Sequence, residues 1–187
     1  MPILEGVKID WTAFAALTAL AIWMVDGYRR RRERRASRRL LAQIMTAPVA
    51  VAQLEIAKLR SLVVPPGGED TTYLLRLLND QCERQDLACR ASAIRIELPS
   101  QFLDKAEIFS EVLSNRLALA FAQVNRLGSV CKIFGELSDT AEKDEIAESL
   151  RLVLIQIQDA EQSVGEAFNA LLREGKASTR FHRLSQK

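Results

Sequence analysis

Residues 11–39 read WTAFAALTALAIWMVDGYRRRRERRASRR, an uncharged apolar run followed directly by a block of arginines. No charged side chain lies between positions 11 and 25, whereas residues 29–39 contain eight arginines and one glutamate. An apolar helix with a basic flank is typical of a membrane anchor. The sequence therefore predicts a transmembrane helix over residues 9–28, after a short extracytoplasmic N-terminus at residues 1–8.

The apolar run is short for a helix that crosses a bilayer. Its 15 uncharged residues extend about 22 Å, against a hydrocarbon core of roughly 30 Å. Including the flanking residues gives about 28 Å and places Asp10 and Asp26 at the two headgroup boundaries. Trp11, Trp23 and Tyr28 lie near the ends of the segment, so we expect their rings at the membrane interface.

Three other interpretations of this segment compete. A cleaved signal peptide has its positive charge before the apolar run, which is the reverse of the order here. A helix lying in the interface needs a polar face, and Thr12 and Thr18 are the only polar side chains in residues 11–25 other than the two tryptophans. A buried helix of a soluble domain needs no greater length than this, and it stays open as an alternative.

The arginine block predicts the orientation of the protein. Arginine and lysine are retained on the cytoplasmic side, so we expect a single-pass protein of a bacterial inner membrane, with its N-terminus outside and its C-terminus in the cytoplasm. Basic clusters beside a membrane helix also bind anionic lipids, at about 1 kcal/mol per residue. The residues assigned to topology and lipid contact are Arg29, Arg30, Arg31, Arg32, Arg34, Arg35, Arg38 and Arg39. They surround the helix without interleaved aromatic residues, which argues against nucleic-acid binding.

The basic character of the chain is local. The 187 residues carry a net charge of +2, of which the block at residues 29–39 contributes +7, whereas residues 40–187 carry −3. We expect a juxtamembrane helix over residues 29–45, a mildly acidic cytoplasmic domain over residues 46–175 that is long enough for one hydrophobic core, and a polar tail over residues 176–187.

Cysteine and histidine give no sign of a metal or redox site. Cys82, Cys89 and Cys131 have no metal-like spacing, and in the cytoplasm we expect them to be reduced and buried. On one continuous helix, Cys82 and Cys89 would lie about 10 Å apart, too far for a disulfide. His182 is the only histidine, which excludes most His-based sites, and we expect it at the surface.

The sequence predicts an all-α fold. Pro65–Gly68 indicates a loop, Pro99 a helix boundary with Ser100 as N-cap, and Gly175 a helix end. The intervening residues are good helix formers. We expect one N-terminal transmembrane helix followed by a cytoplasmic bundle of about four helices, of which the last two form a long antiparallel coiled-coil-like hairpin.

The clearest periodicity runs from Thr140 to Glu174. Apolar residues recur there at alternating intervals of four and three, as in a coiled coil, and we expect this seam to meet a partner helix. The seam consists of Ile146, Leu150, Val153, Ile157, Ala160, Val164, Ala167 and Leu171. Leu154 and Phe168 widen it, which indicates more than one neighbour, and Asp139 and Thr140 are expected to cap the helix.

The preceding helix is expected from Ser100 to about Leu137. Residues 117–124 are uncharged and apolar nearly all around the helix but far too few to span a bilayer, so they predict a core helix. The connection at Glu136–Asp139 is short, which favours antiparallel neighbours. Gly128 can allow a close helix approach or a kink.

Two weaker helices are expected before residue 100. Pro48 fits the first turn of a helix, so we expect the arginine helix to end or kink near Met45. The helix after Pro48 would run through Val51, Leu54, Ile56 and Leu59 to about Leu62. The next helix would start near Asp70–Thr72, carry Leu74, Leu75, Leu78 and Cys82, and end at about residue 95. Residues 94–98 alternate apolar and charged side chains, which leaves helix or strand open.

No motif in the sequence indicates catalysis. There is no P-loop, no dinucleotide-binding glycine pattern, no nucleophile elbow and no zinc spacing. A di-metal carboxylate bundle needs Glu-x-x-His motifs, which the chain lacks. We therefore expect no enzyme activity, no catalytic residue, no cofactor, no metal and no nucleic-acid partner.

The leading hypothesis is a non-enzymatic, membrane-anchored adaptor or scaffold. Its helical bundle would bind another helical protein or a second copy of itself. The alternative is a self-assembling, signal-transducing or channel-type membrane subunit, because small residues in the apolar run permit close helix packing. These small residues are Ala13, Ala15, Ala16, Ala19 and Ala21. A soluble helical enzyme and a nucleic-acid binder rank behind both.

Overall fold

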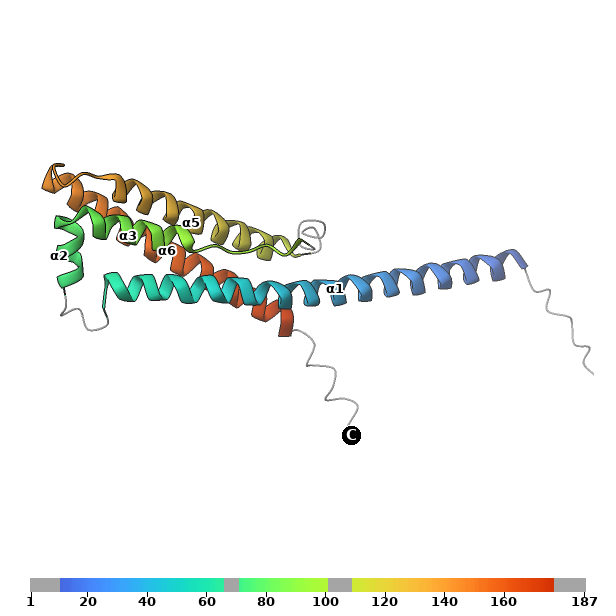
Figure 1. Cartoon of the computed structure of the whole chain (residues 1–187). Coiled ribbons are helices and arrows are strands. Elements are labelled where there is room, and N and C mark those ends of the chain that lie inside the picture. Colours follow the sequence, from blue (N-terminus) through green and yellow to red (C-terminus); the bar gives the residue numbers. More distant parts are fainter. Residues whose placement is uncertain (1–10, 66–70, 101–108, 177–187) are drawn as a thin grey trace, which may run out of the picture. The chain divides into compact units, whose positions relative to one another are not determined.

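The structure, a computed structural model, describes residues 11–65, 71–100 and 109–176. Within these residues it contains five main helices and no strand, so the all-helical prediction is confirmed. The helices are α1 (Trp11–Val63), α2 (Thr72–Asn79), α3 (Gln81–Ala93), α5 (Glu111–Glu136) and α6 (Lys143–Lys176) (Figure 1). The contacts divide the chain into two compact units, Met1–Arg38 and Arg39–Lys187, and α1 contributes to both.

Helix α1 continues through Pro48, so the predicted helix end near Met45 is wrong. A proline inside a helix removes one backbone hydrogen bond and costs about 3 kcal/mol. Met45 and Val49, on either side of the break that we expected, have no exposed surface. The burial of such side chains, at about 1.5–3 kcal/mol each, offsets the cost of the proline.

A heptad seam that the sequence analysis missed lies in the second half of α1. Its members are Ala42, Met45, Val49, Ala52, Ile56, Leu59 and Val63, all buried. Ile56 and Leu59 were expected to line this helix, but Val51 and Leu54 are 56% and 62% exposed. Two alanines take the core positions of this seam, and alanine is a weak signal of burial in a sequence.

The helix expected over residues 72–95 is divided at Asp80. This residue is extended, with φ −133° and ψ 117°, and its carboxylate accepts a hydrogen bond of 2.8 Å from the backbone N–H of Cys82. Helix α3 therefore has its own N-cap. It ends at Ala93, and the following residues up to 99 are neither helix nor strand. Ile94 and Ile96 are nevertheless buried, so the alternation in this segment marks a coil that lies along the core.

The helix expected from Ser100 is interrupted before Ser110. The hydroxyl of Ser110 accepts a hydrogen bond of 3.4 Å from the N–H of Leu113, and α5 begins there. Residues 101–108, which carry part of the predicted pattern, lie outside the described residues. In α5 the buried apolar residues recur at intervals of four and three: Leu113, Leu117, Ala120, Val124, Leu127, Cys131 and Phe134.

Helix α5 packs against α6 on one side and against α3 on the other. Between α5 and α6, the amide of Gln156 donates a hydrogen bond of 2.6 Å to the side-chain oxygen of Gln123. Gln156 is only 3% exposed, so these two amides satisfy each other inside the contact.

Helices α3 and α5 approach closely at two glycines. A Cβ atom at Gly135 would lie 2.9 Å from the Cβ of Ala88, whereas one at Gly128 would lie 3.7 Å from the Cα of Ser92. Because the later glycine faces the earlier part of α3, the two helices are antiparallel. The close approach that we expected at Gly128 is tighter at Gly135.

The second half of α1 lies beside α6 (Figure 1). The Arg60 guanidinium makes an ion pair of 2.7 Å with Glu161, and Gln43 approaches Gly175. The earlier residue of α1, Gln43, lies against the later residue of α6, Gly175, and the later residue, Arg60, lies against the earlier one, Glu161. Helices α1 and α6 are therefore antiparallel here. Helix α6 ends at Lys176, one residue beyond Gly175, so the helix end predicted there is correct to within one residue.

Candidate membrane anchor and interaction surfaces

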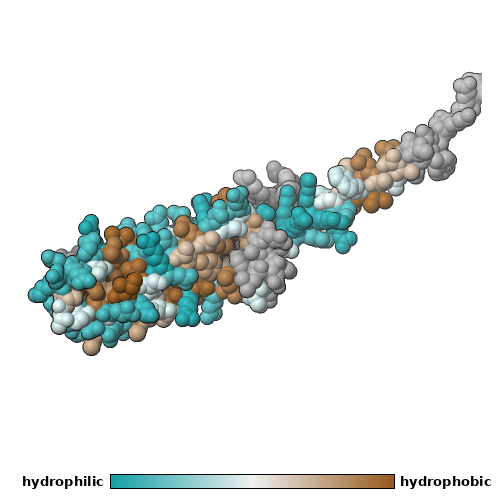
Figure 2. Space-filling model, turned by 90° about the horizontal axis from the view of Figure 1, so that it is seen from above, coloured by the Kyte–Doolittle hydropathy of each residue, from teal (hydrophilic) through white to brown (hydrophobic). Residues whose placement is uncertain are grey.

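The apolar segment of α1 is exposed wherever its side chains are described. Every residue from Ala15 to Val25 is exposed, and Trp23 is 74% exposed. Figure 2 shows an apolar stretch of the unit that ends at Arg38, next to a hydrophilic stretch. In the described part of the chain, α1 is the one helix long and apolar enough to cross a membrane. Apolar surface left in water costs about 25 cal/mol per Å², which makes this segment a candidate anchor by length and composition.

Asp26 and Glu33, the two acidic residues that follow the apolar segment on α1, are paired with arginines. Asp26 forms an ion pair with Arg30 at 2.8 Å, and Glu33 forms an ion pair with Arg29 at 2.9 Å. Each pair joins residues four positions apart on the helix. Such exposed pairs contribute little stability. The pair with Arg30 does neutralise the Asp26 carboxylate at the predicted headgroup boundary, where an isolated charge would be less favourable.

The other residues predicted to contact lipid are placed on α1 as follows. Tyr28 is 71% exposed, and Trp11 belongs to α1 but its side chain lies outside the described residues. Four arginines are exposed and form no ion pair within the described residues: Arg31, Arg32, Arg34 and Arg35. Their guanidinium groups are therefore available to lipid phosphates. Arg38 and Arg39 are partly buried.

The seam of α6 does not lie at the surface. All eight of its residues are buried in the core of the chain: Ile146, Leu150, Val153, Ile157, Ala160, Val164, Ala167 and Leu171. They pack against the chain's own helices, so the expectation that this seam meets a partner is revised. Leu154 and Phe168 are partly buried, consistent with α6 lying between two neighbours.

Exposed apolar side chains occur elsewhere on the folded unit. On α5 they are Val112, Leu119 and Ile133, and on α6 they are Leu152 and Ile155, each between 47% and 63% exposed. Figure 2 shows apolar patches among hydrophilic side chains on one face of the protein. These outer faces, unlike the seam of α6, carry exposed apolar side chains.

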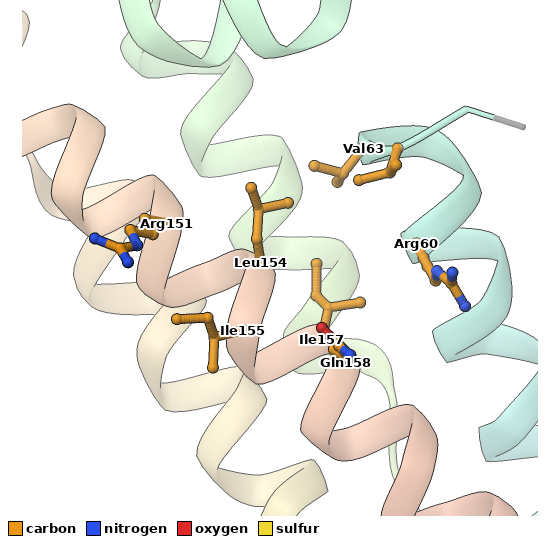
Figure 3. Close-up of a pocket in the computed structure, with 8 residues that line it drawn as sticks. Arg60, Val63, Arg151, Leu154, Ile155, Ile157 and Gln158 are labelled. Atoms are coloured by element: carbon orange, nitrogen blue, oxygen red, sulfur yellow. The ribbon is translucent and has the colours of Figure 1, made fainter. Parts of the chain in front are cut away.

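A groove with a volume of about 340 Å³ lies between the end of α1 and α6. Figure 3 shows Val63 of α1 and Leu154 and Ile157 of α6 reaching toward the gap between the two helices. Arg60 and Arg151 lie on its rim. Arg60 is held by Glu161, and Arg151 lies 3.8 Å from Glu148. The groove is therefore an apolar gap with charged edges that are already paired.

Two of the three cysteines differ from their predicted environment. Cys82 and Cys89 are exposed on α3, whereas Cys131 is buried, as we expected for all three. Burial raises the pKa of the Cys131 thiol to about 12, so it stays protonated at neutral pH. His182 lies outside the described residues.

A buried arginine that the sequence analysis did not single out joins three parts of the fold. Arg84 has no exposed surface, and its guanidinium donates to the backbone oxygens of Leu77 and Leu137, each at 3.0 Å. It also donates to the Asp139 carboxylate at 2.7 Å. The two carbonyls belong to the C-terminal ends of α2 and α5, where a cation is favoured by the helix dipole. Asp139, expected to cap the last helix, serves this arginine instead.

The described residues offer no arrangement for metal chemistry, since they contain no group of three His, Cys, Asp or Glu side chains placed to hold an ion. The acidic residues at the start of α6 complement its dipole. No known protein family, curated protein or solved structure matches the sequence. The function therefore has to be argued from the residues alone.

Proposed function

We propose that this chain is a membrane-anchored helical interaction protein of adaptor or scaffold type. Residues 9–28 would span the inner membrane, the arginines of residues 29–39 would lie against cytoplasmic headgroups, and the unit from Arg39 onward would bind a partner. The observation that carries the proposal is the change of environment along α1. Its side chains are exposed on every side and almost all apolar from Ala15 to Val25, whereas from Leu41 onward one face of the helix is buried in a protein core.

The charge pattern supports the same arrangement. Eight arginines directly follow the apolar stretch, and four of them are exposed without an acidic partner among the described residues. Each can contribute about 1 kcal/mol at an anionic surface, and together they favour the cytoplasmic side. The pairing of Asp26 with Arg30 lowers the cost of placing that carboxylate at the boundary.

The test is membrane association followed by topology. The full chain, expressed in a bacterium, should stay in the membrane fraction after an alkaline carbonate wash. A reporter that works only in the cytoplasm should be active when it is fused after Lys187. A reporter that works only outside the cytoplasm should be inactive there. Release by carbonate would contradict the anchor, and activity of a reporter that works only outside the cytoplasm would contradict the orientation.

Partner binding is tested separately in native membranes. Chemical cross-linking and mass spectrometry of the full chain should give links from the exposed faces of α5 and α6 to one abundant protein. Links confined to copies of the same chain would favour the alternative, a self-assembling signalling or channel-type subunit. The continuity of α1 from Trp11 to Val63 supports signalling within that alternative, because one helix joins the apolar segment to the core.

A further inference from the structure

A second groove, between α3 and α5, differs from the others in its charges. It has a volume of about 460 Å³ and is lined by residues of α3, of the coil after it and of α5. Arg95 and Lys132 are its only charged lining residues, and no carboxylate lines it. Neither cation forms an ion pair within the part of the chain that the structure describes.

Because α3 and α5 are antiparallel, Arg95 and Lys132 lie at opposite ends of the groove. Gly128 lies against Ala91 and Ser92 in the middle of the groove. Lys132 is one turn further along α5, toward the start of α3. Arg95 follows the end of α3, on the other side of Gly128. Because Gly128 has no side chain, the backbones of α3 and α5 lie close together between the two cations.

The polar groups between the cations are hydroxyls and an amide, which can donate a hydrogen bond as well as accept one. Ser92 and Asn125 line the groove with a hydroxyl and an amide that make no side-chain hydrogen bond to the described residues. The Ser129 hydroxyl donates to the backbone oxygen of Asn125 at 3.1 Å. Two cations and neutral donors, without a carboxylate, are complementary to an oxyanion, because charge-assisted hydrogen bonds to phosphate are the strong ones.

We propose that the groove between α3 and α5 binds a phosphate-bearing ligand through Arg95 and Lys132. The shared chemistry is a phosphate ester or diphosphate, carried either by a small soluble molecule or by a lipid headgroup. The apolar lining residues Ile94 and Val124 are only 7% and 3% exposed, so the recognition would rest on the charged and polar groups. This proposal does not depend on the anchor, since it concerns only the unit from Arg39 onward.

The experiment measures the reactivity of Lys132 toward an amine-acylating reagent by mass spectrometry. The full chain is held in nanodiscs of phosphatidylcholine alone, with and without added pyrophosphate, and in nanodiscs that contain phosphatidylglycerol. Lys143, an exposed lysine outside the groove, is the internal reference. The controls are Arg95→Gln, which removes one cation of the groove, and Arg126→Gln, which removes an exposed α5 cation that does not line it.

Protection of Lys132 by pyrophosphate in phosphatidylcholine nanodiscs would support a soluble phosphate ligand. Protection by phosphatidylglycerol without pyrophosphate would support a lipid headgroup. In either case Arg95→Gln should weaken the protection about tenfold, because one charge-assisted hydrogen bond is lost, and Arg126→Gln should leave it unchanged. No protection, or equal protection of Lys143, would overturn the proposal. A chain that fails to insert into nanodiscs would contradict the anchor alone, and the pyrophosphate experiment is then repeated in a neutral detergent.

Discussion

The guanidinium of Arg84 and the carboxylate of Asp139 lie 2.7 Å apart, although the two residues are 55 positions apart in the chain. The arginine side chain is fully buried, whereas that of Asp139 is 55% exposed. The same guanidinium holds two helix-terminal carbonyls. The unequal exposure of the two partners predicts unequal effects of their removal.

Replacing Arg84 should be far more damaging than replacing Asp139. Arg84→Met leaves two carbonyl oxygens without their donor, and we expect it to lower the free energy of unfolding by about 2–4 kcal/mol. Asp139→Asn removes only a half-exposed ion pair and should cost about 0–1 kcal/mol. Chemical denaturation of the full chain in mild detergent, followed by far-UV circular dichroism, measures both. Equal losses would contradict the assignment of the main effect to the carbonyls.

The two glycines of α5 should respond in opposite directions to alanine. Gly135→Ala places a Cβ 2.9 Å from that of Ala88 and should destabilise the fold by about 1–3 kcal/mol through overpacking. Gly128→Ala places it 3.7 Å from the nearest atom and should stabilise by roughly 0.5–1 kcal/mol, because alanine is the better helix former. The same denaturation measurement applies, and each variant is the control of the other.

The anchor predicts different effects for two exposed leucines on the same helix. Leu17 and Leu54 are 65% and 62% exposed, and both belong to α1. Leu17→Arg should move the chain out of the carbonate-resistant membrane fraction, because an arginine near the bilayer centre costs about 3 kcal/mol. Leu54→Arg should leave the fractionation unchanged. Retention of both variants in the membrane would show that residue 17 does not meet hydrocarbon.

The exposure of the three cysteines predicts how many of them a thiol reagent will modify. A maleimide at neutral pH should modify the exposed Cys82 and Cys89 quickly in the native chain, and Cys131 only after denaturation. Intact-mass spectrometry counts the labels. Rapid modification of all three thiols would mean that the contact between α3 and α5 opens readily.

The Cys131 thiol also predicts a loss of stability in alkali. Burial raises its pKa to about 12 in the folded chain, above the value of about 8.5 expected when unfolded. Above the lower value the unfolded chain binds fewer protons than the folded one, so the free energy of unfolding falls as pH rises toward about 12. Tyr73, whose pKa is raised mainly by burial, acts in the same direction. The free energy of unfolding should fall less between neutral pH and about pH 10.5 for Cys131→Ala than for the native chain, and denaturation curves at the two pH values measure this.

Much of the helical fold follows from periodicity. The seam of α6 was expected over Thr140–Glu174, and the helix runs from Lys143 to Lys176 with all eight seam residues buried. Long segments with a regular apolar pattern are predictable because packing and propensity agree. The partner assigned to the seam was not predictable, because periodicity gives the apolar face but not which helix covers it.

The errors fall where local and tertiary effects compete. Pro48 has the local properties of a helix start, but burial on both sides keeps α1 continuous. The division at Asp80 had a local signal, since Asp80 with Glu83 three residues later forms a capping pattern that the sequence analysis overlooked. Arg84 had none, because its partners come from separate parts of the chain.

The amide pair between Gln123 and Gln156 also decides which alignment of α5 and α6 the chain adopts. Both helices repeat every seven residues, so sliding one along the other by one repeat would still match apolar side chains with apolar side chains. Such a slide would leave both amides without each other, at a cost of about 1–3 kcal/mol for a buried unsatisfied group. This polar contact thus favours the observed registration, together with the connection of six residues between the two helices.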